Sequence, residues 1–148
     1  MTLSAVPADG EAPWPEAGER PIAFLVDASS SMERRLVGQW IDRHRPEAAE
    51  YRVCAVPPSR RRRRKRSVGA ALTAVAASDS DPLLVPLRVA WLGPRRKGRR
   101  IPQLVDLLTL GDPRDPNRLL QELFVRFRPD RIRVVAGDAA PLSALRQR

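Results

Sequence analysis

The segment over residues 22–41 constrains the fold of this chain more than any other. It opens with the continuous apolar run IAFLV at residues 22–26, whose length suits a strand that is buried on both faces. Ser30 and Glu33 follow at the spacing of a capping box, in which each side chain satisfies a free backbone N–H group at a helix start. One apolar face at helical spacing comes next, formed by Met32, Leu36, Val37, Trp40 and Ile41. The segment therefore predicts a buried strand followed directly by an amphipathic helix.

The same order of strand and helix continues along the chain. Further strands are expected at residues 51–56, 87–92 and 132–136, and further helices at 67–77, 101–108, 115–127 and from 142 onward. This alternation predicts an α/β fold with a small, largely parallel sheet of about four strands and helices packed on it.

The boundaries of this domain come from composition and from proline. Residues 1–20 are rich in Pro, Gly, Ala and Glu without periodicity, which predicts a disordered leader before a domain at 21–148. The first helix should end near His44, because Pro46 disfavours helix at the residue before it. The last helix has no stop signal before Arg148, so we expect the sequence to be a truncated piece of a longer one.

Positive charge is concentrated in two clusters. Their twelve cations exceed the formal net charge of +10, so the rest of the chain is close to neutral. The first basic cluster consists of Arg60, Arg61, Arg62, Arg63, Arg64, Lys65 and Arg66. The second basic cluster consists of Arg95, Arg96, Lys97, Arg99 and Arg100. Such clusters attract polyanions, which include acidic lipid headgroups, phosphorylated ligands and nucleic acid.

Three interpretations of the first basic cluster stay open. It can hold the protein to an anionic leaflet, where each cation near the surface contributes about 1 kcal/mol. It can bind nucleic acid by pairing with phosphates, but no aromatic residue is interleaved to stack on bases and no DNA-reading motif surrounds it. It can also be a solvated loop without a partner. The sequence favours an anionic membrane surface over nucleic acid.

The chain carries no signal for export. No basic segment followed by an apolar one opens the sequence, and no apolar run approaches the roughly 20 residues that span a bilayer. Cys54 is the single cysteine and lies in a strand-like run, so we expect its side chain to be buried as a small apolar group. A single cysteine also fits a protein of a reducing compartment. These features predict a cytoplasmic protein, for which contact with a membrane would be from the surface.

One loop suggests a metal site. Asp27, Ser29 and Ser31 match the D-x-S-x-S pattern of von Willebrand factor A-type domains, in which the aspartate and two serine hydroxyls converge on magnesium. This resemblance implies an adhesion domain. That family adds a threonine and an aspartate from later loops. Here the only later threonines are Thr73, inside an expected helix, and Thr109, inside the run LLTL, and the candidate aspartate is Asp138. The alternative is that the serines simply cap a helix.

A catalytic motif is not evident. Acyltransferases of the glycerophospholipid type use an H-x-x-x-x-D motif, in which histidine is the general base and aspartate orients it. His44 is the only histidine, and the residue five positions later is Ala49. We therefore predict no catalytic residue and no cofactor, and we interpret His44 as a residue that interacts favourably with the carboxyl end of the helix.

The second half of the chain carries a more specific pattern. The segments VPLRVAWL (85–92), LLTLGDPRDPN (107–117) and RPDRIRVVAG (128–137) follow one another, and ASSSMERRLVGQWI (28–41) precedes them. In order and spacing, these segments resemble the amino-terminal region of bacterial membrane-associated glycerol-3-phosphate 1-O-acyltransferases. The resemblance covers about residues 22–148. It departs from the family at Gly111 and Asp112, between which an arginine often lies.

This resemblance implies a function for a longer parent protein. The family transfers an acyl group from acyl-CoA or acyl carrier protein to the sn-1 hydroxyl of glycerol 3-phosphate, in phospholipid biosynthesis. Its catalytic residues lie further along than this sequence reaches, so none is carried over. We expect the 148 residues alone to be inactive. The resemblance implies that this domain is peripheral at the inner face of the cell membrane. Its partner would be the anionic membrane surface, which the two basic clusters would contact.

Overall fold

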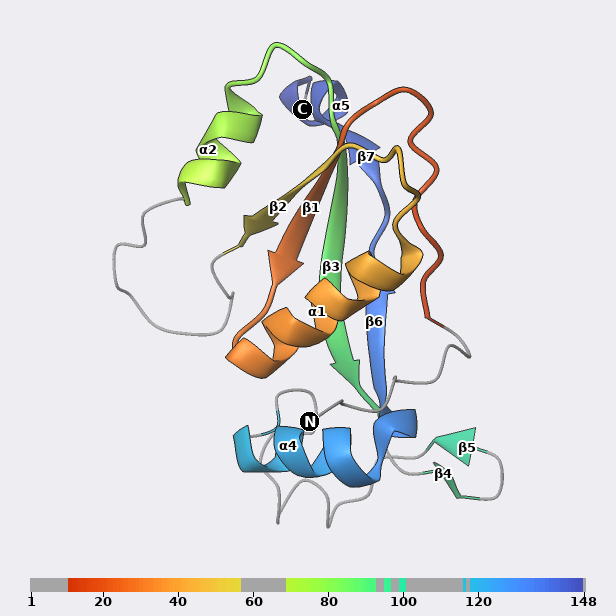
Figure 1. Cartoon of the computed structure of the whole chain (residues 1–148). Coiled ribbons are helices and arrows are strands. Elements are labelled where there is room, and N and C mark those ends of the chain that lie inside the picture. The colour runs from red at the N-terminus through yellow and green to blue at the C-terminus, as the bar shows by residue number, and fades with distance from the viewer. Residues whose placement is uncertain are drawn as a thin grey trace.

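The computed structural model describes residues 11–56, 69–92, 95–96, 99–100, 116 and 118–147, with side chains left undescribed at the four hairpin residues and at Arg118. Its elements follow one another as shown in Figure 1. They are β1 (Ile22–Asp27), α1 (Ser31–His44), β2 (Tyr51–Ala55), α2 (Ala70–Ala76), β3 (Leu83–Trp91), β4 (Arg95–Arg96), β5 (Arg99–Arg100), α4 (Arg118–Phe127), the 3-10 helix η1 (Pro129–Arg131), β6 (Ile132–Ala136), β7 (Ala140–Pro141) and α5 (Leu142–Arg146).

The main sheet has the strand order β2-β1-β3-β6, and β7 pairs with β3 beyond the end of β6. β1 is parallel to both β2 and β3, whereas β6 and β7 are antiparallel to β3. The predicted α/β fold with a small, mostly parallel sheet is confirmed. β6 runs backwards because it begins where β3 ends, with Ile132 opposite Trp91. Alternation of strands and helices alone could not predict this reversal.

Helices cover both faces of the sheet. α1 lies on one face, and α2 and α5 lie toward the other, as Figure 1 shows. β2 and β3 lie on opposite sides of β1, so the two crossovers run in opposite directions along the sheet. Because connections between parallel strands are almost always right-handed, the helices of these two crossovers, α1 and α2, must lie on opposite faces of the sheet.

The predicted first helix is confirmed in detail. Ser30 is the N-cap of α1, and the capping box with Glu33 is complete. The helix ends at His44, where the backbone N–H of Arg45 donates to the carbonyl of Ile41. Its buried apolar residues are Leu36, Val37, Trp40 and Ile41, which are the face that the sequence predicts apart from the half-buried Met32.

An aromatic cluster fills the face of the sheet under α1. Trp40 and Phe24 are completely buried, with ring centroids 5.9 Å apart. Trp14 stacks on Trp40 at 6.0 Å and meets Phe24 edge-on at 5.2 Å. This packing decides the position of the segment that contains Trp14.

Residues 11–20 therefore differ from the prediction of a disordered leader over residues 1–20. The backbone N–H of Ala12 donates to Val134 in β6, and the indole N–H of Trp40 donates to the carbonyl of Ala12 at 3.2 Å. Ala12, Trp14 and Ala17 pack against the core. The half-buried Trp14 outweighs the Pro- and Gly-rich composition around it, because the part of its indole that packs on the core removes apolar area from water. Residues 1–10 lie outside the described part of the chain.

The opposite face has a smaller core. It is formed by Ala23, Cys54, Val75, Leu84 and Leu142. Cys54 is completely buried, as the sequence predicts. α2 is shorter than the expected helix over 67–77, and β3 is longer than the expected strand over 87–92, because it continues through Pro86. The helix expected over 101–108 lies outside the described residues.

Within the described ranges, no helix is long and apolar enough to cross a membrane.

Candidate functional site at the carboxyl end of the parallel strands

The carboxyl ends of β1, β2 and β3 share one edge of the sheet, because these strands are parallel. The chain leaves β1 toward β2 on one side and later reaches β3 on the other side. In open α/β sheets, ligands bind outside the carboxyl ends of the strands at such a reversal of strand order. This edge is therefore the candidate functional site, and the loops that leave it decide its chemistry.

The D-x-S-x-S loop lies at this edge, directly after β1. Asp27 is exposed and is the register partner of Arg88 in β3. The hydroxyl of Ser30 accepts the backbone N–H of Glu33 at 3.1 Å and donates to Oε1 of Gln121 at 2.6 Å. Gln121 belongs to α4, so this bond ties the start of α1 to a helix that lies far along the sequence.

The carboxylate of Glu33 organises the edge from inside. Glu33 is only 6% exposed, and its carboxylate oxygens accept several hydrogen bonds. Oε2 accepts the backbone N–H of Ser29 at 2.7 Å and its hydroxyl at 3.0 Å, and Oε1 accepts the indole N–H of Trp91 at 3.0 Å. A buried carboxylate needs such donors, because its desolvation is otherwise costly. Glu33 therefore positions the loop and β3 and is not available as a proton acceptor for a substrate.

These contacts bear on the magnesium hypothesis for Asp27, Ser29 and Ser31. The hydroxyl of Ser29 is engaged with Glu33, and Ser31 is exposed as the first residue of α1. No group of three or more His, Cys, Asp or Glu side chains that could hold a metal ion occurs among the described residues. The local geometry is that of a helix cap, which is the alternative that the sequence left open.

Of the later residues that a von Willebrand factor A-type site would need, Asp138 lies away from this edge. Thr73 lies within α2, where its hydroxyl is 3.4 Å from the carbonyl of Gly69. Asp138 follows β6, which is antiparallel and leads away from the carboxyl edge. Thr109 lies outside the described residues.

Both basic clusters are attached at this same edge. Val56, just after β2, donates its backbone N–H to Val26, and the chain then enters residues 57–68, which contain the first basic cluster. The second cluster follows β3, and four of its arginines form the β4–β5 pair, with Arg95 opposite Arg100 and Arg96 opposite Arg99. The first cluster and Lys97 lie outside the described residues, so the structure fixes where these segments begin and not where their side chains lie. Only the fold shows that both clusters begin at one edge.

A third feature of this end of the molecule was missed by the sequence analysis. α4 exposes three large apolar side chains: Leu119 is 73%, Leu123 49% and Phe127 63% exposed. The sequence predicts a helix over 115–127 but assigns no function to it. The signal was the four-residue spacing of these side chains, which places them along one side of a helix.

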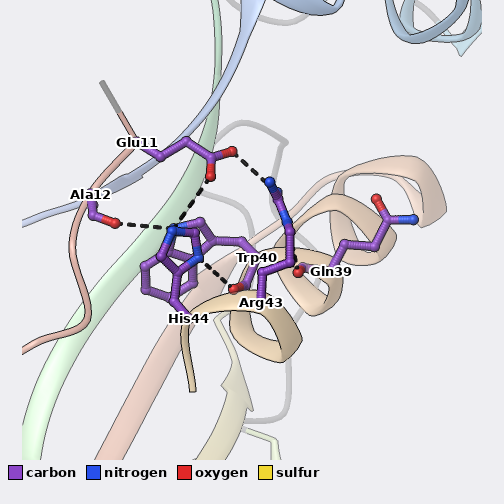
Figure 2. A network of polar contacts seen from close by, with 6 residues as sticks. All are labelled: Glu11, Ala12, Gln39, Trp40, Arg43 and His44. Atoms are coloured by element: carbon purple, nitrogen blue, oxygen red, sulfur yellow. Dashed lines mark hydrogen bonds and ion pairs between the residues drawn. The ribbon is translucent and has the colours of Figure 1, made fainter. Parts of the chain in front are cut away.

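His44 takes part in a polar network at the other end of α1, which Figure 2 shows. One ring nitrogen, Nδ1, lies 2.9 Å from the carbonyl of Trp40, and Nε2 lies 3.7 Å from the carboxylate of Glu11. The other oxygen of Glu11 pairs with Arg43 at 3.2 Å. Because a carbonyl only accepts, Nδ1 carries the proton and donates it. The predicted position of His44 in the last turn of the helix is confirmed.

Cys54 has no features of a nucleophile. Burial raises the pKa of its thiol, and the nearby Arg52 only partly offsets this effect. A thiol must ionise to react, so a buried thiol with a raised pKa is inert at neutral pH.

No protein-family model matches this sequence, and no solved structure matches it.

Proposed function

We propose that this domain is the amino-terminal, non-catalytic part of a glycerol-3-phosphate 1-O-acyltransferase that works at an anionic membrane surface. The parent enzyme would transfer an acyl group from acyl-CoA or acyl carrier protein to the sn-1 hydroxyl of glycerol 3-phosphate. The proposal depends on the resemblance of four segments of the chain to that family.

The observation that carries the proposal is that three of these segments, at residues 28–41, 85–92 and 128–137, form one structural unit; of the segment at residues 107–117 the structure describes only Pro116. VPLRVAWL lies on β3 and RPDRIRVVAG lies on η1 and β6, and the two strands pair from Leu87 opposite Ala136 to Trp91 opposite Ile132. The backbone N–H of Leu92 donates to Arg131 at 2.7 Å, which closes the strand pair at its end. The two segments are therefore neighbours in the sheet, which is what the proposal requires of two parts of one domain.

The glycine that ends the last segment has a physical role in this unit. Gly137 donates its backbone N–H to the carbonyl of Pro86 at 2.8 Å. A Cβ atom at position 137 would lie 3.3 Å from the Cβ of Pro86, which is closer than most such contacts. Glycine therefore lets the chain after β6 approach β3 at the proline, and the segments VPLRVAWL and RPDRIRVVAG fit each other at this point.

The first helix segment joins the same unit. ASSSMERRLVGQWI supplies the cap and α1, and the carboxylate of Glu33 accepts the indole N–H of Trp91 from VPLRVAWL. The hydroxyl of Ser30 donates to Gln121 in α4, which lies between the second and third segments. The Glu33–Trp91 bond joins two of the resembling segments, and the Ser30–Gln121 bond ties the first helix segment to α4 outside them.

We assign the acyl-transfer chemistry to residues beyond this sequence. A general base must reach the acceptor hydroxyl. His44 instead donates Nδ1–H to its own helix and directs Nε2 toward Glu11. The role left for this domain is to support the enzyme and to hold it at the inner leaflet through the basic clusters, whose attachment points share the carboxyl edge of the sheet.

The test begins with the coding DNA downstream of Arg148. We expect an in-frame continuation with an H-x-x-x-x-D motif. The protein of that complete reading frame should transfer labelled acyl groups to glycerol 3-phosphate, and replacing the histidine of that motif by alanine should abolish transfer. The 148-residue chain should transfer none. A complete reading frame whose product shows no acyl transfer with either donor would overturn the proposal.

A further inference from the structure

The apolar stripe on α4 is the largest exposed apolar feature of the described residues. Leu119, Leu123 and Phe127 are spaced by four residues, so they lie along one side of the helix. Other large exposed apolar side chains in this part of the chain, Val53 and Leu145, are single and 48% and 49% exposed. Scattered apolar residues need no explanation, whereas a continuous stripe indicates an interaction surface.

The stripe faces outward because the opposite side of α4 is fixed. Gln121 is 2% exposed and accepts the hydroxyl proton of Ser30 at 2.6 Å, while its amide donates to the carbonyl of Pro116 at 3.0 Å. Val125 is 9% exposed and belongs to the main core. Rotating α4 to bury the stripe would break these contacts, so the stripe is a stable feature of the surface.

Positive charge lies at the Phe127 end of the stripe, whereas Glu122, next to Leu123, is exposed and acidic. The guanidinium of Arg126 lies 5.5 Å from the ring centre of Phe127, and Arg128 is exposed. Arg131 stacks on Phe124 at 4.3 Å and donates to the carbonyl of Leu92 at 2.7 Å. The β4–β5 pair starts three residues after Leu92, so its first arginine lies within about 11 Å of that residue. The apolar stripe and the second basic cluster therefore begin at the same end of β3.

We propose that the Leu119, Leu123 and Phe127 stripe docks into an anionic lipid bilayer, with Arg126 and Arg128 at the headgroups. Leucine and phenylalanine on one side with arginine beside them is the composition of helices that lie in the membrane interface. The charge selects an anionic bilayer over a neutral one. This inference rests on the membrane part of the proposed function and is independent of the acyl-transfer chemistry.

The experiment measures binding of the purified full chain to vesicles by flotation. Vesicles of phosphatidylcholine are compared with vesicles that also contain phosphatidylglycerol, at low and high salt. We expect binding to the anionic vesicles that weakens with salt. A variant with L119Q, L123Q and F127Q should lose about 100-fold or more in partitioning, because removal of each buried methylene weakens binding severalfold. The variant with R126E and R128E should lose about 25-fold or more, about fivefold for each cation.

Matched variants separate the stripe from general effects. L145Q changes an equally exposed leucine on α5, and R35E changes an exposed arginine on α1; both should bind like the wild type. The first basic cluster is intact in every variant, so binding that survives loss of the stripe would show that the stripe does not dock. The inference would also be overturned if sedimentation showed a dimeric wild type and a monomeric triple variant, because the stripe would then be a dimer interface. Failure of acyl transfer with normal vesicle binding would instead contradict only the proposed function.

Discussion

The core on the face of the sheet under α1 is built around aromatic rings, whereas the described core under α2 and α5 is smaller and holds none. Trp40, Phe24 and Trp14 make up much of the first core, and Ala23, Cys54 and Val75 are typical of the second. The difference begins in β1, whose alternate residues point to opposite faces. Ile22 and Phe24 point one way and Ala23 points the other, so one strand supplies two cores of unequal size.

The two faces also use polar contacts differently. On the first face, the buried carboxylate of Glu33 ties α1 to β3. On the second face, the partly exposed carboxylate of Asp81 accepts the backbone N–H of Ser143 at 2.7 Å and its hydroxyl at 3.0 Å, which holds α5 in place. Because apolar burial provides most of the folding free energy, we expect global stability to depend on the first face and local opening to occur on the second.

The largest effect should follow Trp40→Ala. The indole is fully buried, contacts Trp14 and Phe24, and donates to Ala12. Its loss should reduce the free energy of unfolding by about 3–5 kcal/mol in a urea titration. Trp40→Phe should cost less and keep the protein folded if the alanine variant does not fold. A loss of less than 1 kcal/mol for alanine would show that the aromatic face is not the main core.

Glu33→Ala should have the next largest effect. It removes the capping box and leaves the indole N–H of Trp91 and the backbone N–H of Ser29 without their acceptor. We expect a loss of about 2–4 kcal/mol in unfolding free energy, because each buried donor without a partner is costly. Glu33→Gln keeps one acceptor oxygen, so its free energy of unfolding should lie between those of the wild type and the alanine variant. Equal stability of all three proteins would contradict this role.

Val75→Ala tests the second face directly. Val75 is 3% exposed and packs in the small core from α2. Removing two methyl groups should lower the free energy of unfolding by about 2 kcal/mol. Amide hydrogen exchange should speed up in α2 more than in α1, since we expect the second face to open locally. Uniform acceleration over both helices would show that the two faces unfold together.

Asp81→Ala should have a smaller effect that depends on pH. The hydrogen bond from the backbone of Ser143 lowers the pKa of the Asp81 carboxyl from its ordinary value of 3.8, helped by Arg20 and Arg146. A lowered pKa means that the ionised form favours the folded state, so this stability is present above the ordinary value and is lost as pH falls through the folded one. The variant should melt about 3 °C lower at pH 7, and the difference should shrink below about pH 4. A constant difference down to pH 2 would exclude the carboxylate as its cause.

Cys54 allows the second face to be probed without destabilising it. Burial raises the pKa of its thiol, so a thiol reagent should react with the native protein at least about 100-fold more slowly than with the unfolded protein. In the Val75→Ala variant, reaction should accelerate because the same small core opens more often. In the L145Q variant, which changes an exposed side chain, it should not.

Local patterns predicted much of this fold. The capping box of Ser30 and Glu33, the end of α1 near Pro46 and the strand of β6 follow from short-range spacing, since they depend on backbone groups within a few residues. The ordered path of residues 11–20 could not be predicted in this way. Composition describes local preference and does not show that Trp14 packs against Phe24 and Trp40. Propensity is overridden wherever distant residues supply the contacts.

The candidate site shows the same division. The sequence identified the two basic clusters and the D-x-S-x-S loop from residue types and their order, and the proposed relation to an acyltransferase family rests on that order as well. Only the tertiary structure placed the starts of both clusters and the loop at one edge of the sheet, since the direction of each strand decides which loops meet.

The sequence by itself determined that this chain alternates strands with helices, caps its first helix and concentrates its charge, because these properties depend on neighbouring residues. The tertiary structure decided that β6 returns antiparallel to β3 and that α4 turns Gln121 inward. It thereby decided that Leu119, Leu123 and Phe127 face solvent. An amphipathic pattern gives a helix an apolar side, but which part of that side is buried depends on long-range contacts such as the bond between Gln121 and Ser30.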